Sequence, residues 1–470
     1  MAYSGPMLPA PDICRRARLA RDLRFDGHFI VGVVTTGVFC RPICPARLPA
    51  EENVRYFATS AAAMEAGYRP CLRCHPERES PLPTWTISSE IVVRAVRMID
   101  NGYLAERPVR ALAAEIGVGE RHLNRLFREE LGTTPKGLAR MRRIALAKRL
   151  VDETHLAMTD VAFAAGYGSV RRFNDEFSRV FRRPPRAARR KRMVSGSFPV
   201  SLRLPTRQPF NADWVFSFLA RRALPGLESV RGHTYRRRVD RHCISVSHRD
   251  GALWLEVPGA LADRTSDVLA RVRRVFDLDA DPDAIDSHLL ESPECAPWVR
   301  AGRGIRVPGT WDAFEGAVRA ILGQQVRVDR ATDPAARLTK TFGIDGFPTP
   351  AALENAEVAA IGIPGLRAAA IRQLAGIVHE RGDAFLLDPP TARETLLAID
   401  GIGPWTAEYV AMRVARDPDA FLASDWVVRK AMGTNVRDAL RRAEPWRPWR
   451  AYAVMHLWRA YSTPFTQGST

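Results

Sequence analysis

Four of the seven cysteines in this chain of 470 residues fall between positions 40 and 74, in two close pairs. Three residues separate Cys40 from Cys44, and two residues separate Cys71 from Cys74. Four thiolates in two such pairs suit a tetrahedral Zn²⁺, because each short loop supplies two ligands. The other three cysteines are scattered, so the cluster favours a metal site over disulfide bonds. The spacing predicts one zinc ion, and by itself it favours a purely structural role for that ion.

A second group that could do chemistry is Asp425, the single acid in the apolar segment FLASDWVVRKAM. About 20 residues earlier, Gly401 and Gly403 separate two helical patterns. A tight turn of this kind exposes backbone N–H groups, and the helix that follows adds a dipole that favours phosphate. The pattern is typical of a helix-hairpin-helix, which binds DNA without sequence preference. The alternatives are a simple turn between helices and, for Asp425, an N-cap.

Two segments with a helix-turn-helix pattern lie between these groups, at residues 109–132 and 158–185. In each, an Ala-rich helix ends at a glycine, Gly117 or Gly166, and a helix with polar and basic residues follows. One copy is weakly specific, but two copies about 50 residues apart indicate helices that enter the major groove of DNA. The pattern does not separate base contacts from phosphate contacts. The side chains expected to face the groove are Arg121, His122, Asn124, Arg125, Val170, Arg171, Arg172 and Asn174.

The elements that must position these groups belong to a basic chain, whose 70 Lys and Arg and 52 Asp and Glu give a formal charge of +18. Residues 84–193 hold 23 basic and 12 acidic residues, so this stretch alone carries 23 − 12 = +11. Such a charge favours a polyanionic partner, nucleic acid first. No apolar run approaches the ~18 residues of a membrane span, and the start has no signal-peptide pattern. We therefore expect a cytoplasmic, nucleoid-associated protein with no membrane partner.

The surroundings of the cysteines resemble the N-terminal domain of the bacterial adaptive-response family, Ada. The matching segments are FDGHFIVGVVTTGVFCRPICPAR, ENVRYF and AGYRPCLRCHPE, within about the first 80 residues. The resemblance implies a zinc that is catalytic as well as structural: Cys40 accepts a methyl group irreversibly from a DNA phosphotriester, and the other three cysteines complete the ligand set. Zinc keeps a thiolate deprotonated near neutral pH. Arg47 and Arg69 flank the cysteine loops and are candidates for phosphate binding, or else ordinary basic surface.

Two further resemblances cover most of the remaining chain. The tandem motif, over residues 87–188, resembles the AraC-type DNA-binding domain, with recognition helices that start near Gly119 and Ser169. From about residue 202 to the end, the chain resembles the bacterial 3-methyladenine DNA glycosylase II, AlkA. The segments that carry this resemblance, besides the hairpin, are FNADWVFSFLARRA, VFDLDADP, WDAFEGAVRAILGQQV and AEPWRPWRAYAVMHLW.

The glycosylase resemblance implies that Asp425 is the catalytic carboxylate and that Trp405, Tyr409 and Trp458 line the pocket for a flipped base. A 3- or 7-alkylated purine is cationic, so stacking on electron-rich rings favours it. A plain hydrophobic core is the alternative for these aromatics. Lyase relatives carry a lysine just after the hairpin, where this chain has Trp405. We therefore expect a monofunctional glycosylase that needs no cofactor.

Three positions depart from the glycosylase pattern. Gln325 takes the position of the apolar wedge that fills the gap left by the flipped base. Arg459 stands where the family has an aromatic residue, which predicts an altered pocket wall. Pro334 falls where a continuous helix is expected, which predicts a kink or a local rearrangement.

These observations predict a multidomain α+β protein with four parts. The predicted parts are a zinc-thiolate methyl-acceptor domain (1–82), an all-α tandem helix-turn-helix domain with a basic linker (83–192), a small α/β subdomain with an antiparallel sheet (193–282) and an all-α helix-hairpin-helix glycosylase domain (283–470). The predicted function is to accept methyl groups, activate repair genes and excise alkylated bases. The expected partners are double-stranded DNA, at damaged and promoter sites, and RNA polymerase, and the expected state is a monomer. The alternatives are a regulator whose glycosylase half only clamps DNA, and a repair enzyme whose basic helices bind DNA non-specifically.

Overall fold

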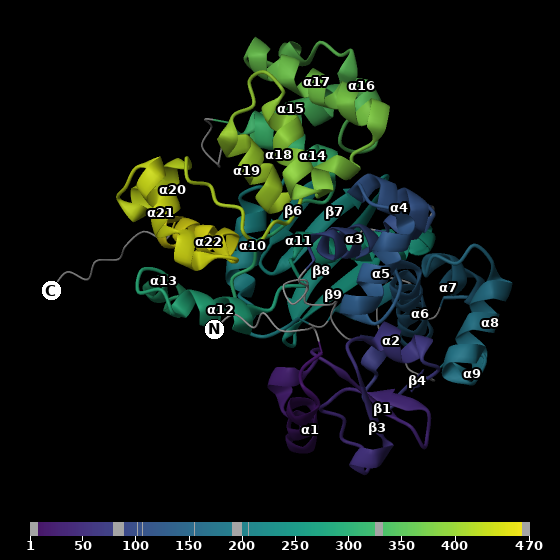
Figure 1. The fold of residues 1–470 in the computed structure, drawn as a ribbon. Coiled ribbons are helices and arrows are strands. Elements are labelled where there is room, and N and C mark those ends of the chain that lie inside the picture. The colour runs from purple at the N-terminus through teal and green to yellow at the C-terminus, as the bar shows by residue number, and fades with distance from the viewer. Residues whose placement is uncertain are drawn as a thin grey trace. The chain divides into compact units, whose positions relative to one another are not determined.

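The computed structural model of this protein describes residues 8–78, 89–100, 102–105, 107–154, 156–189, 200–204, 206–324 and 332–462 (Figure 1). The chain divides into two compact units. The first contains Met1–Leu202 and Glu256–Ala270, and the second contains Arg203–Leu255 and Arg271–Thr470. In the described part of the chain, no helix is both long and apolar enough to cross a lipid bilayer.

The first unit begins with a small four-stranded sheet in the order β3-β1-β2-β4. β1 lies antiparallel to β2 and β3, and β2 is parallel to β4. Gly32 in β1 is required by packing, because a Cβ atom there would lie 2.7 Å from the Phe57 ring. The elements of this part are α1 (Pro11–Ala20), η1 (Leu23–Phe25), β1 (Ile30–Val33), β2 (Val38–Cys40), η2 (Glu51–Asn53), β3 (Val54–Phe57), α2 (Ser60–Glu65), β4 (Arg69–Pro70) and η3 (Pro76–Arg78).

Seven helices follow in the first unit and contain both predicted helix-turn-helix motifs. The first helix of each motif ends next to a glycine with positive φ. Gly117, with a φ of +85°, is the C-cap of α4, and Gly166, with a φ of +84°, directly follows the C-cap residue of α7. The long helix α6 stands between the two motifs in the chain. The elements are α3 (Glu90–Asp100), η5 (Tyr103–Ala105), α4 (Val109–Ile116), α5 (Glu120–Leu131), α6 (Pro135–Glu153), α7 (Met158–Ala164), α8 (Val170–Phe181) and α9 (Pro185–Ala188).

Direct contacts join the small sheet region to these helices. The Thr59 hydroxyl donates a 3.0 Å hydrogen bond to the Leu131 carbonyl, at the end of α5. Ala61 of α2 packs in one buried cluster with Met141 and Ala145 of α6. The predicted domains 1–82 and 83–192 therefore lie in the same compact unit, and the boundaries between the four predicted domains stay predictions.

The predicted antiparallel sheet is present, in the order β5-β9-β8-β7-β6. β7 pairs antiparallel with β6 and with β8, and inward side chains such as Tyr235, Ile244 and Val246 are buried. The strands are β5 (Val200–Leu204), β6 (Glu228–Arg231), β7 (Thr234–Val239), β8 (His242–Arg249) and β9 (Ala252–Val257), with α10 (Ala212–Ala220) between β5 and β6.

The rest of the second unit is helical. One of its core clusters joins α14, α17, α18 and α19 through residues such as Ile321, Leu374 and Val410. After β9, η6 (Gly259–Arg264) lies in the first unit and α11 (Thr265–Val275) begins there. The elements that follow are α12 (Pro282–Leu290), α13 (Ala296–Arg300), α14 (Ala313–Leu322), α15 (Thr332–Phe342), α16 (Pro350–Glu354), η7 (Val358–Ile361), α17 (Gly365–Arg381), η8 (Ala384–Leu387), α18 (Pro389–Leu397), α19 (Pro404–Arg413), α20 (Trp426–Met432), α21 (Val436–Arg442), η9 (Glu444–Trp446) and α22 (Arg450–Ser462).

Pro334 does not kink a continuous helix. α14 ends at Leu322, and Pro334 lies in the first turn of α15, which begins at Thr332. A proline in the first turn removes no intrahelical hydrogen bond, because that N–H has no partner within the helix. The local rearrangement that the sequence predicted is therefore a break between two helices.

Candidate metal centre and base pocket

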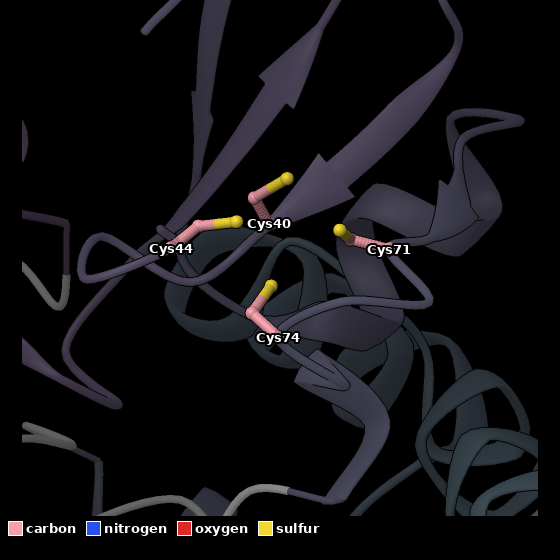
Figure 2. Close-up of side chains that lie close together, drawn as sticks. All are labelled: Cys40, Cys44, Cys71 and Cys74. Carbon is pink, nitrogen blue, oxygen red and sulfur yellow. The ribbon is translucent and has the colours of Figure 1, made fainter. Parts of the chain in front are cut away.

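The four clustered cysteines converge on one point. Their sulfur atoms all lie within 4.8 Å of one another, and Figure 2 shows them turned toward a shared space. The parallel pairing of β2 with β4 brings the two halves together, since the Cys71 N–H donates a 2.9 Å bond to the carbonyl of Phe39, next to Cys40. Four thiol groups at this spacing match the tetrahedral sulfur shell of a structural zinc site. The four cysteines thus form the zinc-binding site that the spacing predicted.

Backbone N–H groups distinguish the four sulfurs. The Arg73 N–H donates to the Cys71 sulfur and the Arg41 N–H to the Cys74 sulfur, each at 3.4 Å, and the Ala46 N–H is hydrogen-bonded to Cys44. Within the described residues, the Cys40 sulfur has no such backbone donor. A hydrogen bond to a thiolate withdraws electron density from sulfur. Cys40 is thus the sulfur least stabilised by the backbone.

Basic side chains surround the cysteine loops. Arg47 is exposed three residues after Cys44, and Arg69 is half-buried in β4. Arg41, next to Cys40, forms an ion pair with Asp26, and its Nε lies 2.8 Å from Oδ1 of that residue. Sequence reasoning overlooked Arg41, although its position beside Cys40 was the available signal.

The two recognition helices present most of the predicted groove residues to solvent. In α5, Arg121 and Arg125 are exposed, while Asn124 is half-buried and donates a 3.0 Å bond to the Glu120 carbonyl of its own helix. In α8, the predicted residues Arg171, Arg172 and Asn174 are all exposed. The opposite face of α8 buries Phe173, Phe177 and Phe181, so packing fixes which face stays free.

The hairpin between α18 and α19 exposes both of its glycines. Gly401 has a φ of +87°, and a Cβ atom there would lie 2.8 Å from the Leu366 side chain. Gly403 is the N-cap residue of α19. The Gln324 side-chain amide donates to the Gly401 carbonyl at 3.1 Å and to the Thr406 hydroxyl at 2.8 Å. Gln324 therefore links the end of α14 to the hairpin, a contact that sequence reasoning missed because no local pattern encodes it.

Asp425 caps α20 and is buried, with 8% of its surface exposed. Its Oδ1 accepts the Val428 N–H at 3.0 Å and the Trp458 indole N–H at 3.1 Å. Its Oδ2 accepts the Trp405 indole N–H at 2.9 Å. Asp425 is therefore the N-cap of α20, as the alternative predicted, and it also accepts hydrogen bonds from two indoles on other helices. Both carboxylate oxygens of Asp425 therefore accept hydrogen bonds from side chains or backbone of other residues.

The three predicted pocket aromatics form one stack around this carboxylate. The Trp405 and Tyr409 ring centroids are 5.1 Å apart with planes 25° from parallel, and Tyr409 lies 6.3 Å from Trp458. Phe218 of α10 continues the stack, 6.3 Å from Trp458 and 14° from parallel. Trp405 and Tyr409 are half-buried, Tyr409 also packs against the hydrophobic core, and Trp458 is buried, so the core alternative stays open. Phe218 belongs to a segment that carries the glycosylase resemblance, but the sequence did not indicate that it joins these aromatic rings.

Arg459, another departure from the glycosylase pattern, contacts α13 and Gly302. Arg459 donates a 3.1 Å hydrogen bond to the Trp298 carbonyl and packs against Gly302, where a Cβ atom would lie 2.5 Å from its guanidinium. Its guanidinium is therefore held by α13 and by Gly302 just after that helix, which gives this arginine a packing role. The predicted wedge residue Gln325 lies outside the described residues.

Comparisons with known families match three stretches of the chain. A model of the metal-binding domain of Ada matches residues 13–77, a helix-turn-helix domain model matches residues 112–191, and a model of the AlkA N-terminal domain matches residues 201–312. These stretches follow the order of the zinc centre, the recognition helices and the antiparallel sheet with its flanking helices.

Three curated proteins extend these matches. A probable bifunctional transcriptional activator/DNA repair enzyme AlkA of Mycobacterium tuberculosis is 39% identical over 97% of this chain and 97% of its own length. DNA-3-methyladenine glycosylase 2 of Escherichia coli is 33% identical over 53% of this chain and 94% of its own length. The bifunctional transcriptional activator/DNA repair enzyme Ada of Escherichia coli is 40% identical over 28% of this chain and 37% of its own length.

Proposed function

Because this chain belongs to the family of bifunctional transcriptional activators and DNA repair enzymes, we propose that it senses and repairs alkylated DNA through three linked activities. It carries an Ada-type methyl-acceptor domain and an AlkA-type glycosylase on one polypeptide. The proposed activities are methyl transfer from DNA phosphotriesters to Cys40, transcription of repair genes directed by α5 and α8, and excision of alkylated bases. The convergence of two indole donors and a stacked aromatic pocket on Asp425 is the observation that carries the excision activity.

The methyl transfer is a displacement at carbon. The Cys40 thiolate sulfur attacks the methyl carbon of a phosphotriester, an S–C bond forms, and the C–O bond breaks with its electron pair left on a phosphodiester oxygen. When bound, Zn²⁺ supplies a thiolate that stays deprotonated near neutral pH. The missing backbone donor at Cys40 supports its choice as acceptor, since the other three sulfurs are hydrogen-bonded. Arg47 and Arg69 would hold the neighbouring phosphates.

Base excision uses the pocket of the second unit. A flipped base stacks against Trp405, Tyr409 and Trp458, and a cationic 3-methyladenine gains from these electron-rich rings. Asp425 stabilises the positive charge that develops on the sugar as the glycosidic bond breaks. Water then adds to the sugar, since the position just after the hairpin holds Trp405, which has no amine to form a Schiff base. We propose a monofunctional glycosylase for this reason.

Both halves act on double-stranded DNA. The hairpin glycines Gly401 and Gly403 would bind phosphate backbone through their exposed N–H groups, while the exposed arginines of α5 and α8 read a promoter site. We further propose that the protein acts as a monomer, in the cytoplasm at the nucleoid, and that RNA polymerase is its partner at promoters.

A glycosylase assay with the full chain on methylated duplex DNA tests the excision activity. We expect free 3-methyladenine and abasic sites, and no covalent adduct after borohydride treatment. A chain that binds this DNA but releases no base would favour the alternative, a regulator whose glycosylase half only clamps DNA. Footprinting on candidate promoters tests the remaining alternative, because non-specific helices would protect no preferred sequence.

A further inference from the structure

In the cluster of aromatic rings that we propose as the base pocket, a tyrosine hydroxyl lies near two arginines. Arg413, one turn after Tyr409 on α19, donates a 2.6 Å hydrogen bond from Nη1 to the Tyr409 hydroxyl. Arg222, just after α10, places a second positive charge near this hydroxyl, and its guanidinium lies 3.8 Å from the Phe218 ring centroid and 5.6 Å from that of Trp458. Two positive charges therefore stand within the aromatic stack that would hold the base.

The charge of Arg413 is fixed in place. Its Nε donates to the Pro308 carbonyl at 2.8 Å and its Nη2 to the Gly309 carbonyl at 2.9 Å, and 7% of the residue is exposed. Because these carbonyls use the donors that point away from the pocket, the remaining Nη1 is held toward Tyr409. Arg413 cannot turn away to leave the hydroxyl unpaired without breaking three hydrogen bonds.

The other charged groups near Tyr409 come from α19 itself and from the neighbouring helices α10, α18 and α20. Arg222 and its neighbour Arg221 come from the end of α10. Asp425, at the start of α20, bonds the indoles of Trp405 and Trp458, whose rings lie on either side of Tyr409 in the stack. On α19 itself, Glu408 pairs with Arg393 of α18 at 2.8 Å. Arg413 and Arg222 are thus the charges that act directly on the hydroxyl.

These surroundings change the acidity of the hydroxyl. Burial by itself would raise the pKa of Tyr409, but the charges of Arg413 and Arg222 outweigh it and lower the pKa to about 8. A tyrosine in water has a pKa of about 10. The Tyr409 hydroxyl is therefore neutral below about pH 8 and becomes a phenolate above it.

We propose that Tyr409 sets the charge of the base pocket, so that the preference of the enzyme for cationic over neutral damaged bases changes with pH. The inference rests on the proposed glycosylase function. With a neutral phenol, two guanidinium charges oppose a cationic base. With a phenolate, one of those charges is cancelled, and the anionic ring beside Trp405 attracts a cation directly. The preference for cationic bases should therefore rise with pH.

The experiment compares two damaged bases in the same duplex sequence. One is 3-methyladenine, which is cationic in DNA, and the other is 1,N6-ethenoadenine, which is neutral. Single-turnover excision rates are measured with the full chain between about pH 6.5 and pH 9.5, and spontaneous base loss is subtracted. The ratio of the two rates removes pH effects that both substrates share, including any from Asp425. We expect the ratio to rise about tenfold across this range, because one nearby unit charge changes.

Tyr409→Phe keeps the ring and removes the hydroxyl, so its ratio should stay constant with pH. Absorbance titration of the phenolate near 295 nm gives a second measurement without substrate. The wild type and Tyr461→Phe, which removes an exposed tyrosine, should both show one tyrosine that ionises near pH 8, and Tyr409→Phe should lack it.

The outcomes separate this inference from the proposed function. A ratio that does not change with pH in an active wild-type enzyme overturns the inference and leaves the glycosylase function intact. A wild-type titration with no tyrosine ionising below about pH 9 also overturns it. Failure to excise either base at any pH overturns the proposed function, and the inference falls with it.

Discussion

The carboxylate of Asp425 has about four acceptor positions, and three of them are occupied by Val428, Trp458 and Trp405. The remaining position can face the sugar of a flipped nucleotide. Asp425→Asn should retain the cap on α20, since asparagine caps as well as aspartate, but it loses the negative charge. We expect unchanged DNA affinity and a single-turnover excision rate lower by about 100-fold or more.

Asp388→Asn is the matched control, because Asp388 caps α18 in the same way and takes no part in the pocket. It should excise 3-methyladenine at the wild-type rate. Wild-type excision by Asp425→Asn would show that the carboxylate is only a cap.

Trp405 both stacks and donates a hydrogen bond, and a substitution can separate the two roles. Trp405→Phe keeps an aromatic ring but removes the N–H group that lies 2.9 Å from Asp425 Oδ2. A hydrogen bond to a charged group contributes about 1.5–3 kcal/mol, so we expect excision about ten- to hundredfold slower with little change in DNA affinity. Trp426→Phe, at an exposed tryptophan next to Asp425, should leave both quantities unchanged. An equal loss of rate and affinity in Trp405→Phe would assign this residue to stacking alone.

Cys40 is the sulfur without a backbone donor, which predicts where a transferred methyl group will be found. Cys40→Ala should accept no methyl group from methylphosphotriester DNA and should still excise bases through the second unit. Cys243→Ala, at an exposed cysteine outside the cluster, is the control and should accept one methyl group per chain. Peptide mapping by mass spectrometry decides the assignment, and methylation of Cys44, Cys71 or Cys74 in the wild type would refute it.

At the scale of elements, we expect α8 to serve promoter recognition and not repair. Its aromatic face is buried, and Arg171, Arg172 and Asn174 lie on its exposed face. Arg172→Ala should weaken promoter binding by about fivefold or more if it contacts a base, because a base contact contributes about 1–3 kcal/mol. Arg179→Ala, in the last turn of α8, should have a smaller effect. Electrophoretic mobility shifts on promoter and scrambled DNA measure both, and a parallel loss of base excision would contradict the separation.

The elements also show what could be predicted from the sequence. The cysteine pairs, the glycine hairpin and the two helix-turn-helix motifs are short local patterns, so their elements were predicted near their observed positions. Arg222 and Arg413 were missed, because they come from segments far apart in the chain and only tertiary packing brings both to Tyr409. Arg459 was expected at a pocket wall, but the contact that holds its guanidinium, the Trp298 carbonyl, belongs to a different segment.

At the scale of the whole molecule, charge connects sensing with transcription. Four thiolates on Zn²⁺ carry about −2, and methylation of Cys40 reduces this to about −1. One unit charge at ~5 Å and an effective dielectric of ~20 amounts to roughly 3 kcal/mol before salt screening. Even a third of this free energy raises DNA affinity several-fold. We expect methylated protein to bind its promoter more tightly, by a factor that shrinks as salt is added. Equal Kd values for methylated and unmethylated protein at low salt would leave a conformational change as the explanation.

The packing of α2 against α6 has a consequence for protein engineering. Separating the chain at residue 82 would expose Ala61, Met141 and Ala145 to water and break the Thr59–Leu131 hydrogen bond. The zinc centre and the first recognition helix would then each lose the surface that orients it. For transplantation as an alkylation sensor, the zinc domain should therefore be kept together with the helices that follow it, in a cassette that includes residues 8–189. A biosensor that joins this cassette to a different output enzyme would keep the contacts between the zinc domain and the helices that follow it.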